Sequence, residues 1–265
     1  MHPQLSIVVF TRNDADHLRR CLGCLIATPP TADFEVLVFD NASEDDTPAV
    51  VADASRELDA CRLLRTDQET SFSDGNNRGL AEARGRCVLF LNPDTEPVGD
   101  VLDEALQVVR HDSAVGLVSP RLHYPGGDPQ PTGWHLPTPA GLARERLGLR
   151  SRHVEARPAA RLTDVGWLMG CFLLGSKRFV QDLGGFDEDF WFHGTDLEFC
   201  ARVKQAGRRV VRLETASLMH VGHREWDSER TRKSHAATVQ YLRREHGPAA
   251  GALGALSAAT GRWLR

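Results

Sequence analysis

Short apolar segments alternate with amphipathic segments through the first 120 residues of this 265-residue chain. Residues 5–10 (LSIVVF), 34–39 (FEVLVF) and 87–91 (CVLFL) are rich in aliphatic, β-branched and aromatic side chains, which predicts buried strands. Shorter strands are expected at residues 62–65 and 115–119. Apolar runs of this length are typical of a parallel sheet covered on both faces, so the pattern predicts an α/β fold.

The segments between these strands have the periodicity of helices that bury one face. The first helix follows Asn13 or Asp14, either of which can cap it. Its apolar positions recur every three or four residues, at Leu18, Cys21, Leu22 and Leu25. Further helices are expected from Ser43 to about Asp59, from Ser73 to Ala83 and from Val101 to Arg110. Helices in these places can connect parallel strands.

Six prolines interrupt the pattern between residues 121 and 160. We expect a flexible, irregular segment here, whose length is typical of lids and binding loops, although a plain surface excursion has the same composition. Regular structure is expected to return with an apolar segment at 167–174, a helical turn at 177–183, a helix at 195–206, a strand at 209–213, a polar loop at 219–223 and a charged helix at 227–246. The sequence therefore predicts one domain at residues 1–225 and a C-terminal helical extension at residues 226–265.

Composition argues against several classes of protein. Hydrophobic residues make up 41% of the chain and charged residues 26%, which argues against disorder. The formal charge of −4 provides no basic excess for binding nucleic acid. No apolar run approaches the ~20 residues that span a bilayer, and no signal peptide is expected. The six cysteines lie mostly in apolar runs, which predicts reduced thiols in a cytoplasmic protein.

Polar residues follow three of the predicted strands. The segments are Thr11-Arg12-Asn13-Asp14, Asp40-Asn41-Ala42-Ser43 and Asn92-Pro93-Asp94-Thr95. Ligands of such sheets bind beyond the carboxyl ends of the strands, although loop starts and helix caps have the same composition. Asp94 can hold a divalent cation or simply form a turn. Asp40 can accept hydrogen bonds from a base or a ribose.

Two further pairs of residues can carry chemistry. Asp196 and Glu198 lie two apart on a predicted helix and therefore face different directions. Asp196, which follows an aromatic segment, can act as a general base or can be a first-turn acid favoured by the helix dipole. His220 and His223 have the spacing of a metal-binding pair.

Other motifs point away from particular chemistries. Cys21-x-x-Cys24 lies on an apolar helical face with no second pair at zinc-ribbon spacing, so we expect both cysteines in the core. Gly-x-Gly-x-x-Gly, the P-loop pattern and Gly-x-Ser-x-Gly do not occur. Their absence argues against dehydrogenase-type, P-loop and α/β-hydrolase sites.

Seven sequence motifs follow one another along the chain: LSIVVFTRND, VFDNASEDDT, DGNNRGLAEARG, VLFLNPDTE, WLMGCFLL, GGFDEDFWFHGTDLEFCARVKQAG and His220. Together they resemble the family 2 glycosyltransferases of the GT-A fold, in particular the rhamnosyltransferase-like branch. The resemblance covers about residues 5–225, apart from the proline-rich segment. It implies a nucleotide-binding half (1–120), an acceptor and catalytic half (161–225), and inverting transfer of a sugar from a nucleotide-diphosphate donor to a hydroxyl.

The resemblance also implies roles for individual residues in the nucleotide-binding half. Thr11, Asn13 and Asp40 match positions that hold the nucleoside. Asn77 and Arg78 match positions beside the nucleotide or its phosphates.

The metal and sugar sites follow from the same resemblance. Asp94 matches the metal carboxylate of an Asp-x-Asp motif, which has Asn92 at its first position here, and His220 matches a histidine that completes a site for Mg²⁺ or Mn²⁺. Residues that match the sugar pocket and the acceptor-side loop are Trp167, Gly170, Cys171, Asp187 and Glu188.

Asp196 matches the catalytic base of a Glu-Asp-x-Asp/Glu motif. Thr195 stands at the first acidic position of that motif, so Glu198 is the alternative base. Thr195 and Asn92 also favour a different function, a non-catalytic nucleotide-sugar-binding protein. A sugar nucleotidyltransferase is a further alternative, but it would need a glycine-rich, lysine-bearing loop after the first strand, where Thr11-Arg12-Asn13-Asp14 has neither residue.

The resemblance indicates the identities of the sugar donor and the acceptor less narrowly than the type of reaction. The resembled branch suggests dTDP-rhamnose, with UDP and GDP sugars as alternatives, and the acceptor can be a glycan, a glycolipid or a small natural product. The charged C-terminal helix can be an interaction surface that forms a homodimer contact or touches a membrane, the latter placing the protein at the inner membrane face.

Overall fold

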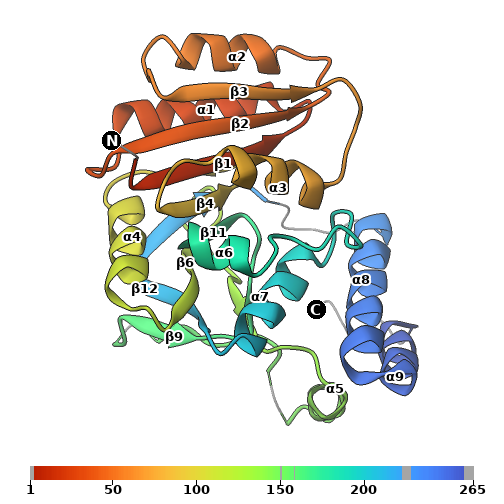
Figure 1. Ribbon diagram of the computed structural model, residues 1–265. Coiled ribbons are helices and arrows are strands. Elements are labelled where there is room, and N and C mark those ends of the chain that lie inside the picture. The colour runs from red at the N-terminus through yellow and green to blue at the C-terminus, as the bar shows by residue number, and fades with distance from the viewer. Residues whose placement is uncertain (1–2, 150, 158, 223–227, 260–265) are drawn as a thin grey trace.

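The computed structural model describes residues 3–149, 151–157, 159–222 and 228–259 (Figure 1). Its strands are β1 (Leu5–Thr11), β2 (Phe34–Asn41), β3 (Cys61–Thr66), β4 (Cys87–Leu91), β5 (Thr95–Glu96), β6 (Val115–His123), β7 (Pro129–Gln130), β8 (Gly133–Trp134), β9 (Leu162–Asp164), β10 (Trp167–Leu168), β11 (Phe172–Ser176) and β12 (Arg209–His220). Its helices are α1 (Ala15–Ala27), α2 (Thr47–Ala54), α3 (Phe72–Glu82), α4 (Val101–His111), α5 (Pro139–Arg146), α6 (Lys177–Asp182), α7 (Thr195–Gln205), α8 (Ser228–His246) and α9 (Pro248–Ala259).

One mixed sheet organises the fold, with the strand order β3-β2-β1-β4-β11-β6-β12-β5 in the described chain. The pairs β2–β3, β1–β2, β1–β4 and β6–β12 are parallel. Strand β11 is antiparallel to both of its neighbours, β4 and β6. The predicted α/β fold with a mostly parallel sheet is confirmed.

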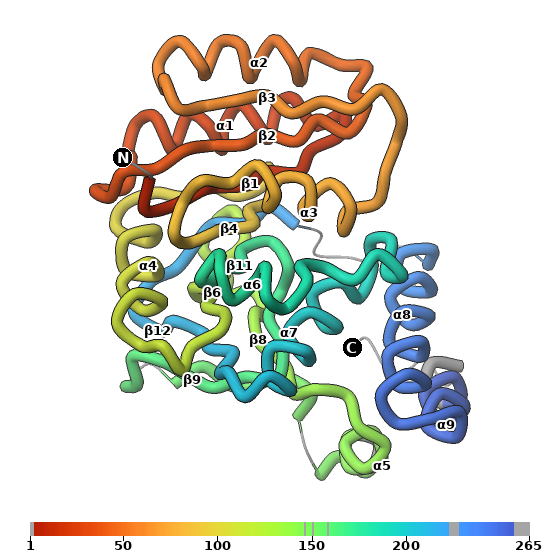
Figure 2. The backbone as a smooth tube through the Cα atoms, in the orientation of Figure 1, coloured from red at the N-terminus to blue at the C-terminus, as the bar shows by residue number. Residues whose placement is uncertain are grey.

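Helices cover both faces of the sheet (Figures 1 and 2). On one face α1, α2 and α4 bury their apolar stripes against side chains such as Ile7, Val38 and Leu89. On the other face α3, α6 and α7 pack against Val8, Phe90 and their neighbours. Alternate residues of a strand point to opposite faces, so strands that are apolar at nearly every position can fill both layers.

Strand β4 has the predicted bounds, Cys87–Leu91, and all five residues are buried. Helix α2 instead ends at Ala54, earlier than the predicted Asp59. The Ser55 hydroxyl donates to the carbonyls of Val51 and Cys61, and the Arg56 amide bonds three residues back to Asp53, so the chain leaves the helix and turns into β3. Local side-chain hydrogen bonds of this kind compete with helix propagation.

The proline-rich segment is more regular than predicted. Residues 121–160 contain the end of β6, the short strands β7 and β8, and α5. Strand β7 pairs with β6, and β8 pairs with β10. The short strands β7 and β8 and the helix α5 were not predicted from the sequence.

Strand β12 runs to His220, well past the predicted end at Leu213, so Met219 and His220 lie in a strand and not in the expected loop. A register shift against β6 between Leu213 and Ser217 marks a bulge that the strand accommodates. His223 lies outside the described residues.

The C-terminal helices α8 and α9 pack side by side beyond the sheet, in blue at the right of Figures 1 and 2. Tyr241 and Leu242 of α8 contact a small apolar cluster that includes Leu197 of α7 and Leu142 of α5. In the part of the chain that the structure describes, none of the helices combines the length and hydropathy needed to cross a bilayer.

Candidate functional site

The carboxyl ends of several strands meet at one edge of the sheet. Thr11 pairs in register with Asp40 across β1 and β2, and Val9 of β1 pairs with Leu91, the last residue of β4. Strand β5, which follows Asp94 directly, pairs antiparallel with the end of β12, where Thr95 lies opposite His220. The three polar strand ends identified in the sequence are thereby brought to one edge.

Thr11 and Asp40 form a buried polar pair at this edge. One Asp40 oxygen, Oδ1, accepts from the Ser43 amide at 3.0 Å. The other, Oδ2, lies 3.5 Å from Nε of Arg65. In the described residues, neither Asp40 Oδ2 nor the Thr11 hydroxyl has a hydrogen-bond partner, although both are buried. Buried polar atoms are normally hydrogen-bonded, so the Thr11 hydroxyl is available to a ligand, and Asp40 Oδ2 has only the Arg65 ion pair within the described chain.

Asn13 shapes the loop beside this pair. Its backbone is left-handed, with φ of 48°, a conformation that asparagine tolerates better than most residues. The Asn13 amide donates to the Ser43 hydroxyl, and the Asn13 side-chain oxygen accepts from the Glu44 amide. Asn13 therefore joins the loops that follow β1 and β2.

Asn77 and Arg78 of α3 are held by protein partners. The Asn77 side chain donates to the Phe186 carbonyl at 2.9 Å and accepts from the Phe186 amide at 2.8 Å. It also donates to Glu188, and Arg78 pairs with Asp74 at 2.9 Å. These contacts fasten α3 to the loop before α7, so Asn77 has a structural role that the sequence did not suggest.

Asp94 and His220 lie together, although 126 positions separate them. Nε2 of His220 is 3.3 Å from Oδ2 of Asp94, and the Gly222 amide donates to the same oxygen at 3.3 Å. Burial favours a raised pKa for Asp94, but the hydrogen bond and charge of His220, together with the Gly222 amide, lower it overall. Asp94 is thus an ionised carboxylate at neutral pH.

Gln130 of β7 orients His220 and was not identified from the sequence. Its Oε1 lies 2.9 Å from Nδ1 of His220. With Nδ1 donating to Gln130, Nε2 is the ring nitrogen directed at Asp94. A second partner on the far nitrogen is the usual arrangement around a metal-binding histidine.

The pair therefore fits a divalent cation. A carboxylate oxygen and an imidazole nitrogen suit Mn²⁺ and, through the oxygen, Mg²⁺. No cluster of three or more potential protein ligands occurs in the described residues. Such a cation would take its other ligands from a bound diphosphate and water, as Mg²⁺ commonly does in nucleotide sites.

Asp196 lies in the first turn of α7, in contact with the segment before β11. Its Oδ2 accepts from the Gly170 amide at 3.1 Å, and its Oδ1 accepts from the Leu197 amide at 2.8 Å. Burial raises the pKa of Asp196 to about 6, although the backbone hydrogen bonds oppose the rise. The carboxylate is therefore held in place and is more basic than an ordinary aspartate.

Glu198 has a different environment, as the helical spacing predicted. Both of its oxygens accept from the Arg202 guanidinium, at 2.6 and 2.9 Å. Arg202 also donates to the carbonyls of Leu183 and Gly185. This buried pair fixes the turn after α6, and Arg202 engages both oxygens of Glu198.

Cys171 lies in the segment that links the turn before Asp94 with Asp196. Its carbonyl accepts from the Asn92 amide at 2.9 Å, which joins the end of β4 to the start of β11. Burial raises the pKa of the Cys171 thiol well above its ordinary value, and the charges of Asp94 and Asp196 add to the rise. The Asn92 amide bonds to Cys171 and the Gly170 amide bonds to Asp196, so the segment 170–171 contacts both Asp196 and the turn that leads to Asp94.

The predicted sugar-pocket residue Trp167 and the acceptor-loop residues Asp187 and Glu188 have partners in other parts of the chain. Trp167 stacks on Trp134 with ring centres 4.3 Å apart, and its buried indole N–H has no hydrogen-bond partner among the described residues. Asp187 pairs with Arg244 of α8, which ties the acceptor-side loop to the C-terminal extension. The ion pair of Asp187 with Arg244 and the hydrogen bond from Asn77 to Glu188 hold this loop in place.

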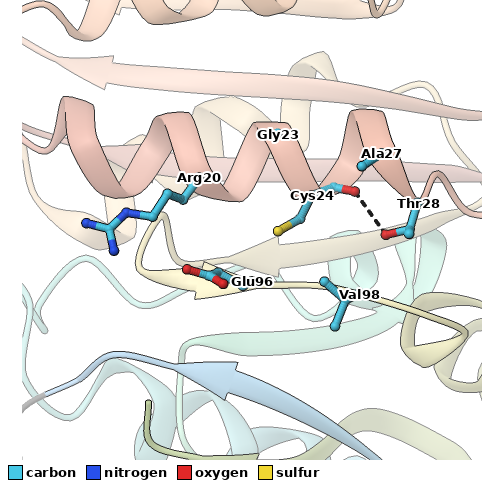
Figure 3. Close-up of a pocket in the computed structure, with 7 residues that line it drawn as sticks. All are labelled: Arg20, Gly23, Cys24, Ala27, Thr28, Glu96 and Val98. Carbon is cyan, nitrogen blue, oxygen red and sulfur yellow. Dashed lines mark hydrogen bonds between the residues drawn. The ribbon is translucent and has the colours of Figure 1, made fainter. Parts of the chain in front are cut away.

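A separate hollow lies between α1 and the segment around β5 (Figure 3). Cys24 and Glu96 line it, and the bond drawn there runs from the Thr28 hydroxyl to the Cys24 carbonyl. Burial, with a smaller effect of Glu96, raises the pKa of the Cys24 thiol, and Cys21 is fully buried. The Cys-x-x-Cys prediction thus holds for Cys21, whereas Cys24 is only partly buried.

Comparison with known proteins places the chain among glycosyltransferases. Residues 6–172 match the model of glycosyl transferase family 2, and residues 150–224 match a model described as the N-terminal domain of galactosyltransferase. The chain is 27% identical over 255 residues to an N-acetylglucosaminyl-diphospho-decaprenol L-rhamnosyltransferase of Mycobacterium tuberculosis, covering 88% of this chain and 80% of that protein.

A further relative and a solved structure are similar to this chain over most of its length. An uncharacterized Sinorhizobium fredii protein, y4gI, is 27% identical over 251 residues, which are 91% of this chain but only 27% of that protein. A mannosyltransferase of Pyrobaculum calidifontis, solved with GDP-Man and Mn²⁺, superposes with a TM-score of 0.67 at 18% identity, covering 100% of this chain and 76% of that one. The structural match shows a shared GT-A fold.

Proposed function

Because the chain belongs to glycosyl transferase family 2, we propose that it is a metal-assisted, inverting enzyme with Asp196 as its general base. It would move a sugar from a nucleotide-diphosphate donor to an acceptor hydroxyl. The proposal is supported by two contacts of the segment 170–171, which bonds to Asp196 through Gly170 and, through Cys171, to the turn whose Asp94 lies beside His220. Two acidic groups of different proton affinity are what this reaction requires, one for the cation and one for the proton.

The nucleoside would bind at the edge formed by β1 and β2. Asp40 and Thr11 would offer oxygen atoms that make no hydrogen bond within the described residues to the base or the ribose. Asn13 would hold the adjoining loops in place. The similarity to a rhamnosyltransferase favours a dTDP-rhamnose donor, while the nucleotide-sugar neighbour was solved with a GDP sugar.

Asp94 and His220 would hold Mg²⁺ or Mn²⁺ against the diphosphate. When bound, the cation would supply positive charge that stabilises the leaving nucleoside diphosphate. Gln130 keeps the His220 ring in the required orientation through Nδ1. The solved neighbour with Mn²⁺ supports a divalent cation in this fold.

Asp196 would remove the proton from the acceptor hydroxyl. The Gly170 and Leu197 amides fix the carboxylate, so its remaining lone pairs can face the acceptor. A pKa of about 6 leaves Asp196 ionised at neutral pH and more basic than an ordinary aspartate. Attack from the side opposite the diphosphate would invert the anomeric centre.

A cytoplasmic location and a peripheral position at the inner membrane face stay predictions.

Two variants separate the binding role from the chemical role. We expect Asp94→Asn to weaken the affinity for a nucleotide-diphosphate sugar in Mn²⁺ by about tenfold or more, because it removes an anionic ligand. We expect Asp196→Asn to retain that affinity and to lose transfer or donor hydrolysis by about 10²-fold or more. Calorimetry and a nucleotide-release assay measure the two quantities. Turnover by Asp196→Asn at the wild-type rate would remove this residue from the mechanism.

A further inference from the structure

A cavity of about 560 Å³ opens at the carboxyl end of β6, between β7, the segment near His153 and β12. Its volume is within the range of small-molecule binding sites. Arg121 and His123 line it from β6, where residues two apart point to the same face. Arg212, Ser217 and Gln130 contribute to the other walls, and none of the lining residues that the structure describes is acidic.

Arg121 is the cation of this cavity that has no counterpart among the described residues. Within the described residues its guanidinium makes no hydrogen bond or ion pair, and its Nε is buried without a partner. Arg212, by contrast, is neutralised by Glu214 at 2.7 Å and donates to the carbonyls of Val154 and Glu155. An unpaired buried donor on a charged group is costly unless a ligand satisfies it.

The walls of the cavity are held by specific contacts. Leu122 pairs with Gln130 across β6 and β7, and its amide donates to the Thr132 hydroxyl at 2.9 Å. His153 forms a strand-like bridge with Trp134 and lies against its ring, with centres 5.5 Å apart. The walls of the cavity are therefore part of the fold.

The cavity adjoins the candidate active site through one shared residue. Gln130 lines the cavity, and its Oε1 lies 2.9 Å from Nδ1 of His220, the residue beside Asp94. The donor diphosphate is already assigned to the Asp94 and His220 side in the proposed function. A second anion in the adjoining cavity would therefore belong to the other substrate.

We propose that this cavity binds a phosphate or diphosphate group of the acceptor, with Arg121 as its principal ligand. Arginine forms paired, charge-assisted hydrogen bonds with phosphate oxygens. His123 and the Ser217 hydroxyl can complete the contacts from β6 and β12. The inference rests on the proposed function for the identity of the second substrate, but the anion site itself can be tested without turnover.

Calorimetric titration with inorganic pyrophosphate in EDTA tests the site in the full-length chain. Without a divalent cation Asp94 repels the anion, so binding reports the cavity. We expect measurable binding by the wild type, about tenfold weaker binding by Arg121→Gln, and partial retention by Arg121→Lys, which keeps the charge. Arg178→Gln is the matched control, because Arg178 is a highly exposed arginine on α6 outside the cavity.

Each outcome bears on the proposal. Equal pyrophosphate affinity of wild type and Arg121→Gln overturns it, as does a wild type that does not bind at millimolar concentration. If Arg121→Gln weakens dTDP binding in Mn²⁺ as much as pyrophosphate binding, the cavity serves the donor, and the acceptor assignment is wrong. Donor hydrolysis unchanged by Arg121→Gln supports the assignment. A wild type that binds pyrophosphate but neither binds nor hydrolyses any nucleotide sugar would refute the proposed function and leave the anion site standing.

Discussion

Replacing Asp196 with asparagine should change how the stability of the protein depends on pH. Burial raises the pKa of Asp196 from its ordinary 3.8 to about 6 in the folded chain. A carboxyl group with a raised pKa binds its proton more tightly when folded than when unfolded. Its favourable contribution to stability is therefore fully present below about pH 4 and is lost as the pH rises through about 6.

The size of this effect follows from the two pKa values. At about 1.4 kcal/mol per pKa unit, ionised Asp196 costs the folded state about 3 kcal/mol at alkaline pH. Linkage places about 1.4 kcal/mol of that cost between pH 5 and pH 7.5. Asparagine carries no charge at either pH, so the free energy of unfolding of Asp196→Asn, relative to wild type, should rise by about that amount over the interval.

The test compares the change in the free energy of unfolding caused by Asp196→Asn at pH 5 with the same change at pH 7.5. Asparagine can accept only through one oxygen, so one of the bonds from Gly170 and Leu197 is lost, at a cost of roughly 1.5–3 kcal/mol. That loss is the same at both pH values and cancels in the comparison.

Urea unfolding of wild type and variant at pH 5 and pH 7.5 measures the effect, with Asp182→Asn as the control. Asp182 is an exposed acid on α6, and its replacement should give no comparable pH dependence. The wild-type rate of donor hydrolysis should also fall as the pH decreases through about 6, because protonated Asp196 cannot accept a proton. A stability difference that is equal at both pH values, together with a flat rate profile, would refute the reasoning.

Two other variants test the surroundings of the site. Glu198→Gln should lower the free energy of unfolding by about 3 kcal/mol, because it leaves the Arg202 guanidinium buried without its carboxylate. Its rate per folded molecule should stay within a few-fold of wild type, and a loss of about 10²-fold in that rate would instead make Glu198 the base. Gln130→Leu should weaken Mn²⁺-dependent donor affinity by about tenfold or more in calorimetry, because His220 loses the partner that orients its ring; unchanged affinity would remove Gln130 from that role.

Much of the first half of the fold could be predicted from the sequence, because its signals are local. Strand β4 lies in the middle of the sheet with side chains buried on both faces, so it is apolar at every position. Helix α1 has its four predicted apolar residues buried, since one face packs against the sheet. In both elements the burial pattern follows directly from residue spacing.

The second half depends on contacts between distant residues, which residue patterns do not reveal. The end of β12 contains Glu214 and Ser217, yet it is a strand, because Arg212 neutralises Glu214 and the strand pairs with β6 across a bulge. Strands β7 and β8 have two residues each and are defined by their partners. Gln130 and Arg121 lie in or beside this region, and no motif distinguished them.

The direction of β11 explains why the two halves of the chain share one site. Because β11 is antiparallel to β4, its first residue, Phe172, pairs with Leu91, the last residue of β4. Gly170, which donates to Asp196, therefore stands beside the turn that contains Asp94. In a parallel arrangement Phe172 would lie opposite Cys87, about four residues and roughly 13 Å from that edge, and Asp196 would be carried away from the diphosphate. A Cβ at position 170 would lie 3.3 Å from Cβ of Asp196. The glycine therefore lets the Asp196 carboxylate approach the backbone just before the antiparallel strand β11 begins.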